Sequence, residues 1–190
     1  MEPQKKVNEA FPNQDFGFIE DEYWKPVIVH GVTMHNYIVS NYGNVIGPQN
    51  RKLKWTRRSK INMYPRVGIC FDPIRYTEKF GHTYRLLTSK NKPNCKVSKL
   101  DADVHILVAN AFLPLDENIP EELKEYIEID GQPKQLWSLL PDHTKLWIRS
   151  LLYVDHIDND KSNPHVSNLT FVSPRGNNPS VKKQRIEGGS

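Results

Sequence analysis

Residues 151–181, LLYVDHIDNDKSNPHVSNLTFVSPRGNNPSV, decide the fold and carry the chemistry of this 190-residue chain. The apolar run Leu151–Val154 ends in an Asp-His pair, and a stretch of polar, turn-forming residues follows it. Residues 168–173 form a second strand pattern. Pro174 then stands at the favoured first position of a helix that Ser173 can cap. The segment therefore predicts a strand, a loop, a second strand and a helix.

The side chains of this segment suit one kind of chemistry. Asp155 and His156 stand at the end of the first strand, and Asn177 and Asn178 stand in the first turns of the helix. Carboxylate and amide oxygens are hard ligands of the kind that Mg²⁺ prefers. A neighbouring imidazole can take a proton from water near neutral pH. Together these groups suit metal-assisted hydrolysis of a phosphodiester.

Short elements are predicted upstream of this segment. Residues 22–47 read as a β-hairpin with its turn around Gly43, and residues 51–90 read as further short strands. Residues 90–99 read as a mobile basic loop. A helix is expected over Val104–Phe112, on the apolar stripe that repeats with helical period.

The limits of that helix and the segment after it are also predicted. Asp101 or Asp103 can cap the helix, and Pro114 stops it. In the following segment we expect a short helix near Glu121–Ile127, a turn at Asp130-Gly131 and a strand over Leu146–Val154. The expected fold class is α+β, with a β-rich basic N-terminal module followed by a ββα motif.

Charge is distributed unevenly along the chain. The net charge is only +4, but residues 46–100 contain 14 basic and 2 acidic residues, whereas residues 101–142 contain 2 basic and 10 acidic ones. Such asymmetry predicts a surface that faces a polyanion. The best candidates for contacts to DNA phosphates are Lys52, Lys54, Arg57, Arg58, Lys182 and Lys183.

Composition excludes several classes of protein. No apolar run approaches the 18 or so residues that span a bilayer, and the N-terminal residues lack the apolar stretch of a signal peptide. Cys70 and Cys95 make no disulfide framework, and with His82 they lack the spacing of a zinc site. We therefore expect an intracellular, cytoplasmic protein.

The motif resembles the HNH, or ββα-metal, endonucleases, in the branch of phage and intron-encoded homing enzymes. The resemblance is carried by Val104–Phe112 (VHILVANAF), Val154–Lys161 (VDHIDNDK), Asn168–Ser173 (NLTFVS) and Asn177, nine residues after Asn168. A weaker match lies upstream, where WKPV from Trp24 and YIVSNYGNV from Tyr37 resemble a DNA-binding module that often precedes this nuclease. The matches touch residues from about 22 to 182.

The resemblance implies a role for each matching residue. Asp155 and Asn177 would be the metal ligands for one Mg²⁺ or Mn²⁺ per active site, and His156 would be the general base. Asn168 would brace the loop and, through it, the histidine. The implied substrate is double-stranded DNA, cut by a monomer or homodimer with no membrane partner. The longer link after His105 and the glycine before Asn177 depart from the family pattern and put substrate positioning in doubt.

The expected organisation has four parts. Residues 1–20 form an arm, residues 21–100 a DNA-binding module, residues 101–185 the nuclease domain and residues 186–190 a tail. The acidic insert, residues 115–142, lies within the nuclease domain and would face away from DNA or contact a partner protein. Two other functions stay open: a DNA-binding protein that does not cleave, and an interaction module that acts through the acidic insert.

Several of these residues also have purely structural interpretations. Asp155 can cap a loop, and His156 can be a satisfied polar residue at a strand end. His105 is as well explained by a core hydrogen bond as by a contact to the site. Asn178 replaces Asn177 if the helix register slips by one. Solvent exposure is the simpler account of Asn163 and His165, and a core anchor the simpler account of Trp24.

Overall fold

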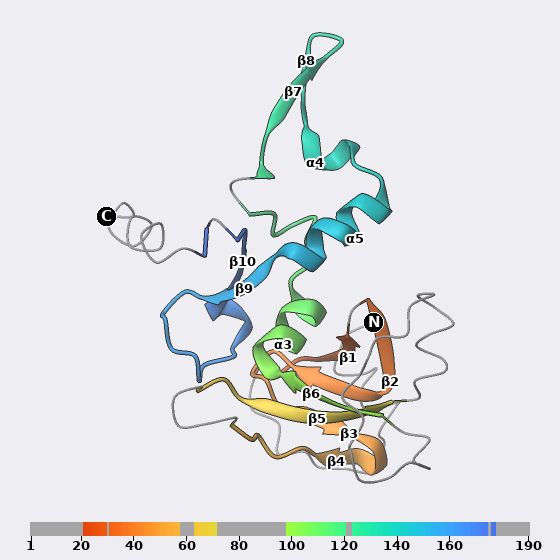
Figure 1. The fold of residues 1–190 in the computed structure, drawn as a ribbon, viewed down its shortest axis with the longest axis vertical. Helices are drawn as coiled ribbons and strands as arrows, with labels where there is room; N and C mark the ends of the chain where they lie inside the picture. Colours follow the sequence, from red (N-terminus) through yellow and green to blue (C-terminus); the bar gives the residue numbers. More distant parts are fainter. Residues whose placement is uncertain are drawn as a thin grey trace.

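The computed structural model of the chain has mixed α+β structure built from small antiparallel sheets, which confirms the expected fold class (Figure 1). The structure describes residues 21–29, 31–57, 63–71, 98–120, 123–174 and 176–177. The N-terminal arm and the tail lie outside the described residues.

The largest sheet contains four strands in the order β1-β2-β3-β4. Its strands are β1 (Trp24–Val29), β2 (Val32–Ser40), β3 (Val45–Gly47) and β4 (Arg51–Lys52), with the short 3-10 helix η1 (Pro48–Asn50) before β4. The predicted hairpin is confirmed, because β2 and β3 pair antiparallel across the turn at residues 41–44. Gly43 has a φ of +84°, a conformation that a glycine adopts without the steric cost of a Cβ.

A second pair of strands leads into the first long helix. β5 (Arg66–Phe71) pairs with β6 (Ser98–Asp103), and α3 (Val104–Phe112) begins at the next residue, where the apolar stripe predicts it. The end of the predicted basic loop, residues 98 and 99, belongs to β6, and the rest of that loop lies outside the described residues.

The cap of α3 differs from the expectation. Asp103 occupies the N-cap position, but its side chain makes no capping hydrogen bond. Its carboxylate instead forms an ion pair with Arg66, with Oδ1 2.7 Å from Nε, and a carboxylate engaged with a guanidinium is not available to the helix N-terminus. Asp101 lies in β6, paired with Gly68, and does not cap the helix either.

The acidic insert contains a β-hairpin and a short helix: β7 (Tyr126–Ile129), β8 (Gln132–Gln135) and α4 (Leu136–Leu139). The next helix, α5 (Asp142–Leu151), begins at the last residue of the insert. The predicted helix near Glu121–Ile127 is wrong from Lys124 onward, because Lys124 and Glu125 are not helical and Tyr126 begins β7. Apolar and polar residues alternate there, and the predicted turn at Asp130-Gly131, with φ of 55° and 70°, closes a tight hairpin. Figure 1 shows this hairpin projecting at the opposite end of the molecule from the four-stranded sheet.

The predicted strand over Leu146–Val154 is wrong up to Leu151, because α5 occupies that stretch. Two features favour the helix: Asp142 lies in its first turn and Arg149 in its last, as the helix dipole prefers. Extended backbone begins only at Leu152.

The last segment has the predicted order of strand, loop and strand. β9 (Tyr153–His156) pairs antiparallel with β10 (Leu169–Val172), and a 3-10 helix, η3 (Val166–Asn168), ends the loop between them. After β10, the hydroxyl of Ser173 accepts the amide of Gly176 at 2.9 Å, and the amide of Asn177 donates to the carbonyl of Ser173 at 3.0 Å. These are the bonds of a capped first helical turn. The expected helix beyond Asn177 lies outside the described residues.

One core joins these parts, with α3 packed against β1, β2 and β6. It continues without interruption from the four-stranded sheet to β10, and β6 crosses the boundary expected at residue 100. Trp24 is buried, as the core-anchor interpretation requires. No helix in the described part of the chain is long and apolar enough to cross a membrane. Among the fully buried apolar residues of the core are Val27, Val39, Val45, Val67, Ile69, Val104, Leu107 and Val108.

Candidate active site

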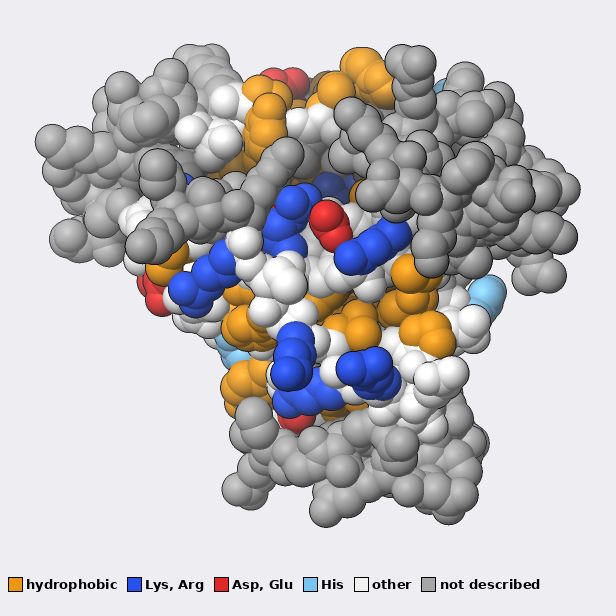
Figure 2. All heavy atoms as spheres, turned by 60° about the horizontal axis from the view of Figure 1, so that its bottom comes forward, with side chains coloured by type: hydrophobic (Ala, Val, Ile, Leu, Met, Phe, Trp, Pro, Cys, Tyr) orange, Lys and Arg blue, Asp and Glu red, His pale blue; other side chains and the backbone are white. Residues whose placement is uncertain are grey.

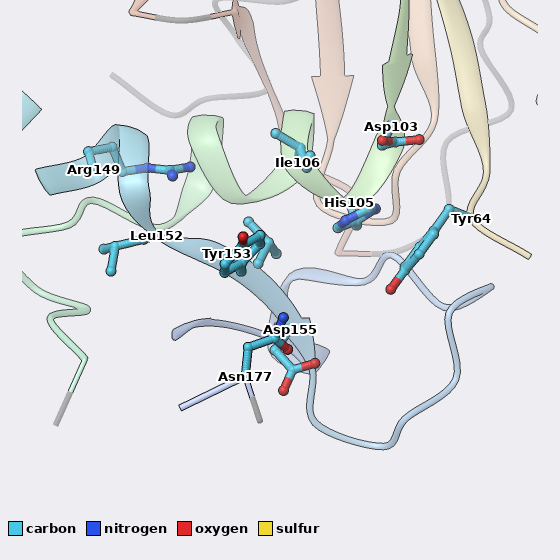
Figure 3. Close-up of a pocket in the computed structure, with 10 residues that line it drawn as sticks. Tyr64, Asp103, His105, Ile106, Arg149, Leu152, Tyr153, Asp155 and Asn177 are labelled. Atoms are coloured by element: carbon cyan, nitrogen blue, oxygen red, sulfur yellow. The ribbon is translucent and has the colours of Figure 1, made fainter. Parts of the chain in front are cut away.

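A cleft of about 250 Å³ lies where β9, α3, α5 and the segment before β5 meet (Figure 3). Its walls combine two carboxylates, an amide, an imidazole, two phenols and a guanidinium. The residues that line it are Tyr64, Asp103, His105, Ile106, Arg149, Leu152, Tyr153, Val154, Asp155 and Asn177.

Asp155 and Asn177 come from separate elements and line this same cleft. Asp155 lies on β9 opposite Thr170 of β10, and Asn177 lies in the capped turn that follows β10. Both side chains are half-buried. Figure 3 shows them next to each other. Their carboxylate and amide oxygens are the donor chemistry that a hard divalent cation requires.

These two donors fit a metal that also binds substrate. Among the described residues, no group of three or more His, Cys, Asp and Glu side chains is gathered closely enough to hold a metal. Two protein ligands leave coordination positions for phosphate oxygens and water, as in sites where Mg²⁺ is held by few carboxylates together with substrate phosphates.

His156 is the last residue of β9 and is buried, and it lies opposite Leu169 of the antiparallel strand β10. Its ring centroid lies 5.0 Å from that of His105 and 5.6 Å from that of Tyr64, and both of these rings line the cleft. The three rings therefore form one cluster beside Asp155. This packing fixes the position of the His156 imidazole against the wall of the cleft.

Asn168 holds the loop between β9 and β10 in place. Its amide Nδ2 donates to Asp158 Oδ1 at 2.8 Å and to the carbonyl of Asn163 at 3.0 Å. Its Oδ1 accepts the amide of Asp158 at 2.9 Å, and its backbone carbonyl accepts the amide of Ile157 at 2.8 Å. Asn168 is buried, so these bonds satisfy its polar side chain and tie together both ends of the loop.

Asp158 and Asp160 accept further hydrogen bonds within the loop between β9 and β10. Asp158 Oδ2 accepts Asn163 Nδ2 at 2.8 Å, and this bond is the largest of several causes that lower the pKa of Asp158. Hydrogen bonds from Ser162 likewise lower the pKa of Asp160. Asn163 is half-buried, which corrects the expectation of simple solvent exposure.

The loop also contacts the turn of the N-terminal hairpin. The ring of the half-buried His165 lies 4.5 Å from that of Tyr42, and the amide of Val166 donates to the carbonyl of Asn41 at 2.9 Å. A Cβ added at Gly43 would lie 2.6 Å from Cγ of Pro164. Only a glycine allows this approach, so the turn that precedes β3 is fitted to the loop that follows β9.

His105 is 5% exposed and stacks on Tyr64, with ring centroids 4.6 Å apart. Burial, and secondly the neighbouring His156, lower the pKa of His105 to about 3, so that it is a neutral imidazole at physiological pH. Its Nδ1 has no hydrogen-bond partner within the described part of the chain. Burial, followed by Asp155 and Asp103, raises the pKa of Tyr64, which keeps the phenol protonated.

Sequence reasoning missed Tyr64 and Arg149 as cleft residues. Tyr64 lies in residues 51–90, for which only short strands are predicted, and Arg149 lies in the stretch 146–154, for which a strand is predicted. The helical periodicity of residues 142–151 is the signal that could have placed Arg149 in the last turn of a helix, where it contacts Asn110 of α3.

Three predicted DNA contacts lie in one exposed segment. Lys52 belongs to β4, and Lys54 and Arg57 follow it, all with exposed side chains. Figure 2 shows Lys and Arg side chains gathered on the face at the bottom of Figure 1, where β4 and β5 lie. The bridge between Thr56 and Arg66 joins this segment to β5, two residues after Tyr64 of the cleft. Arg58, Lys182 and Lys183 lie outside the described residues.

The remaining candidates lie away from the cleft or beyond the described ranges. Cys70 is an exposed residue of β5, and its amide donates to the hydroxyl of Tyr37 at 2.8 Å. Cys95, His82 and Asn178 lie outside the described residues.

Comparison with known proteins gives one likeness in structure. No family model matches the chain, and no curated protein matches it. A solved structure described as "DNA binding and cleavage by the HNH homing endonuclease I-HmuI" is similar at 22% identity and a TM-score of 0.41, over 88% of this chain and 60% of that chain. This chain thus spans less than two thirds of the length of that protein. At this similarity the likeness concerns the fold alone, and function has to be argued from the side chains of the cleft.

Proposed function

We propose that this chain is a metal-dependent DNA endonuclease of the HNH type. The observation that carries the proposal is the convergence of Asp155 and Asn177 on one cleft, beside the buried ring of His156. Residues 101–185 would form the nuclease part. Residues 21–100 would supply affinity for the DNA backbone through Lys52, Lys54, Arg57 and Arg58. Lys182 and Lys183 of the nuclease part would add further phosphate contacts.

Each side chain has one task in the proposed reaction. His156 accepts a proton from the water that attacks the phosphorus, and the bond to the 3′ oxygen breaks. Asn168 positions His156 indirectly, by fixing the loop that leaves β9. Asp155 and Asn177 would hold one Mg²⁺ or Mn²⁺. When bound, that ion supplies Lewis-acid stabilisation of the charge that develops on the phosphate and the leaving oxygen.

Cutting of supercoiled plasmid in Mg²⁺ or Mn²⁺ tests the proposal, with EDTA as the metal-free control and the chain's native locus included as substrate. We expect His156→Ala to lower the cutting rate by roughly 10²–10⁴-fold, the usual contribution of a general base, while DNA binding persists. His35→Ala, at an exposed position on β2, is the matched control and should cut like the wild type.

Two results would count against the proposal. If His156→Ala cuts as fast as the wild type, His156 is not the base. If the wild type binds DNA but cuts neither substrate with either metal, the chain is a DNA-binding protein without cleavage.

A further inference from the structure

Arg149 reaches the cleft from the helix that follows the acidic insert. It lies in the last turn of α5 and lines the same cleft as Asp155 and Asn177. Its guanidinium carbon lies 4.2 Å from the centroid of the Phe171 ring, and its Nη2 donates to Oδ1 of Asn110 on α3. A neutral amide and an aromatic face therefore fix the orientation of this cation without neutralising it.

The charge of Arg149 is only partly hydrated and has no acidic partner within the described part of the chain. Its side chain is half-buried, and none of the described carboxylates forms an ion pair with it. Burial lowers the pKa of Arg149 to about 10, which still leaves it charged at neutral pH. Lys145, one turn earlier on α5, is also half-buried but pairs with Asp116 at 3.1 Å. A cation that is withdrawn from water and faces an open cleft is stabilised when an anion enters that cleft.

We propose that Arg149 forms a phosphate subsite of the cleft, which binds a DNA backbone phosphate beside the one that is cut. The subsite rests on the proposed function, since that function makes DNA the ligand. The planar guanidinium offers donors in the fork geometry that matches two phosphate oxygens, and Asn110 and Phe171 hold the fork in place. The helix that follows the acidic insert thus contributes a cation to DNA binding.

The salt dependence of binding tests the subsite. A fluorescent 40-base-pair duplex is titrated with protein in EDTA, so that no metal-dependent cutting occurs, over a series of salt concentrations. Each phosphate contact contributes about 0.9 to the slope of log K against log salt. We expect Arg149→Met to reduce that slope by about 0.9 and to weaken binding at low salt by about ten-fold. Lys145→Met removes an equal charge from the same helix and should leave the slope unchanged.

A second variant, Asn110→Asp, tests the subsite even if Arg149→Met does not fold. Asn110→Asp keeps Arg149 but places a carboxylate against its guanidinium, at the loss of the hydrogen bond from Asn110 to the carbonyl of Ile28. Thermal denaturation shows which variants are folded. The folded Asn110→Asp protein should show the same reduced slope, because its arginine is already neutralised.

The outcomes separate the subsite from the proposed function. Unchanged slopes in folded Arg149→Met or Asn110→Asp, with a wild type that cuts DNA, overturn the subsite alone. Reduced slopes with a wild type that cuts nothing support the subsite and remove the endonuclease. A wild type that binds no duplex overturns both.

Discussion

Burial beside His156 makes the stability of the folded protein depend on pH through His105. The unfolded chain protonates this histidine below its ordinary pKa of 6.5, whereas the folded protein keeps it neutral down to about 3. The unfolded state therefore binds more protons over this interval, and folding becomes less favourable as the pH falls through it. The sequence allowed two interpretations of His105, a structural role in the core and a contact to the site. The structure supports both, because the ring is buried, stacks on Tyr64 and lines the cleft.

A pH series of urea unfolding checks this behaviour. His105→Gln removes the titration but keeps a polar side chain, so its stability should depend less steeply on pH between 6.5 and 3. Relative to pH 7, the wild type should lose about 2 kcal/mol more than the variant at pH 5. His35→Gln, on the exposed face of β2, should follow the wild type. Parallel curves for the wild type and His105→Gln would show that His105 is protonated in the folded protein.

At the scale of elements, patterns with a local cause were predicted well. The turn at Gly43, the helix 104–112 and the strand–loop–strand order around Asp155 follow from glycine conformation, helical period and turn-forming residues. The strand expected before Val154 failed, because a short apolar run does not distinguish a strand from a helix. Arg149 was missed for the same reason, since its place in the cleft depends on α5 being a helix.

The loop between β9 and β10 makes a prediction at this scale. Asn168→Ala removes the bonds to Asp158 and Asn163 and should lower the free energy of unfolding by roughly 1–3 kcal/mol. Asn168→Asp should lower the free energy of unfolding further, because it replaces the two N–H donors of the amide by an oxygen that faces Asp158 Oδ1. Chemical denaturation measures both, with the exposed Asn36→Ala as control. If the aspartate variant proves as stable as the alanine variant, the hydrogen bonds assigned to Nδ2 do not hold the loop.

At the scale of the whole molecule, the acidic insert divides into an anchored base and a projecting tip. Trp137 is buried and donates to Asp116 at 2.6 Å, whereas the hairpin beyond it is largely exposed, with Tyr126 at 66%. The amide of Leu136 donates to the carbonyl of Glu125 at 2.7 Å, so the two ends of the hairpin are adjacent. The charge of the insert could be predicted from sequence. Its division into a buried base and an exposed tip could not, because that depends on which of its apolar side chains pack against the rest of the protein.

Removal of the tip tests this division. Replacement of residues 126–135 by a short Gly-Ser linker should change the free energy of unfolding by about 1 kcal/mol or less and leave plasmid cutting unchanged. Trp137→Ala should instead cost roughly 3–5 kcal/mol, as expected for a buried tryptophan. Thermal denaturation and plasmid cutting measure both. A loss of cutting on removal of the tip would assign the exposed hairpin a part in catalysis or DNA binding.

The continuous core also bears on how the chain folds during synthesis. Its first strand begins at Trp24, and the last apolar residues that complete it, Leu169 and Phe171, are among the last described residues of the chain. Contacts between residues so far apart in sequence form slowly, because the long intervening chain has to be ordered first. The core therefore cannot close before residues 169–171 have been synthesised, and we expect the sheet of β1–β4 and the cleft to become ordered in one step.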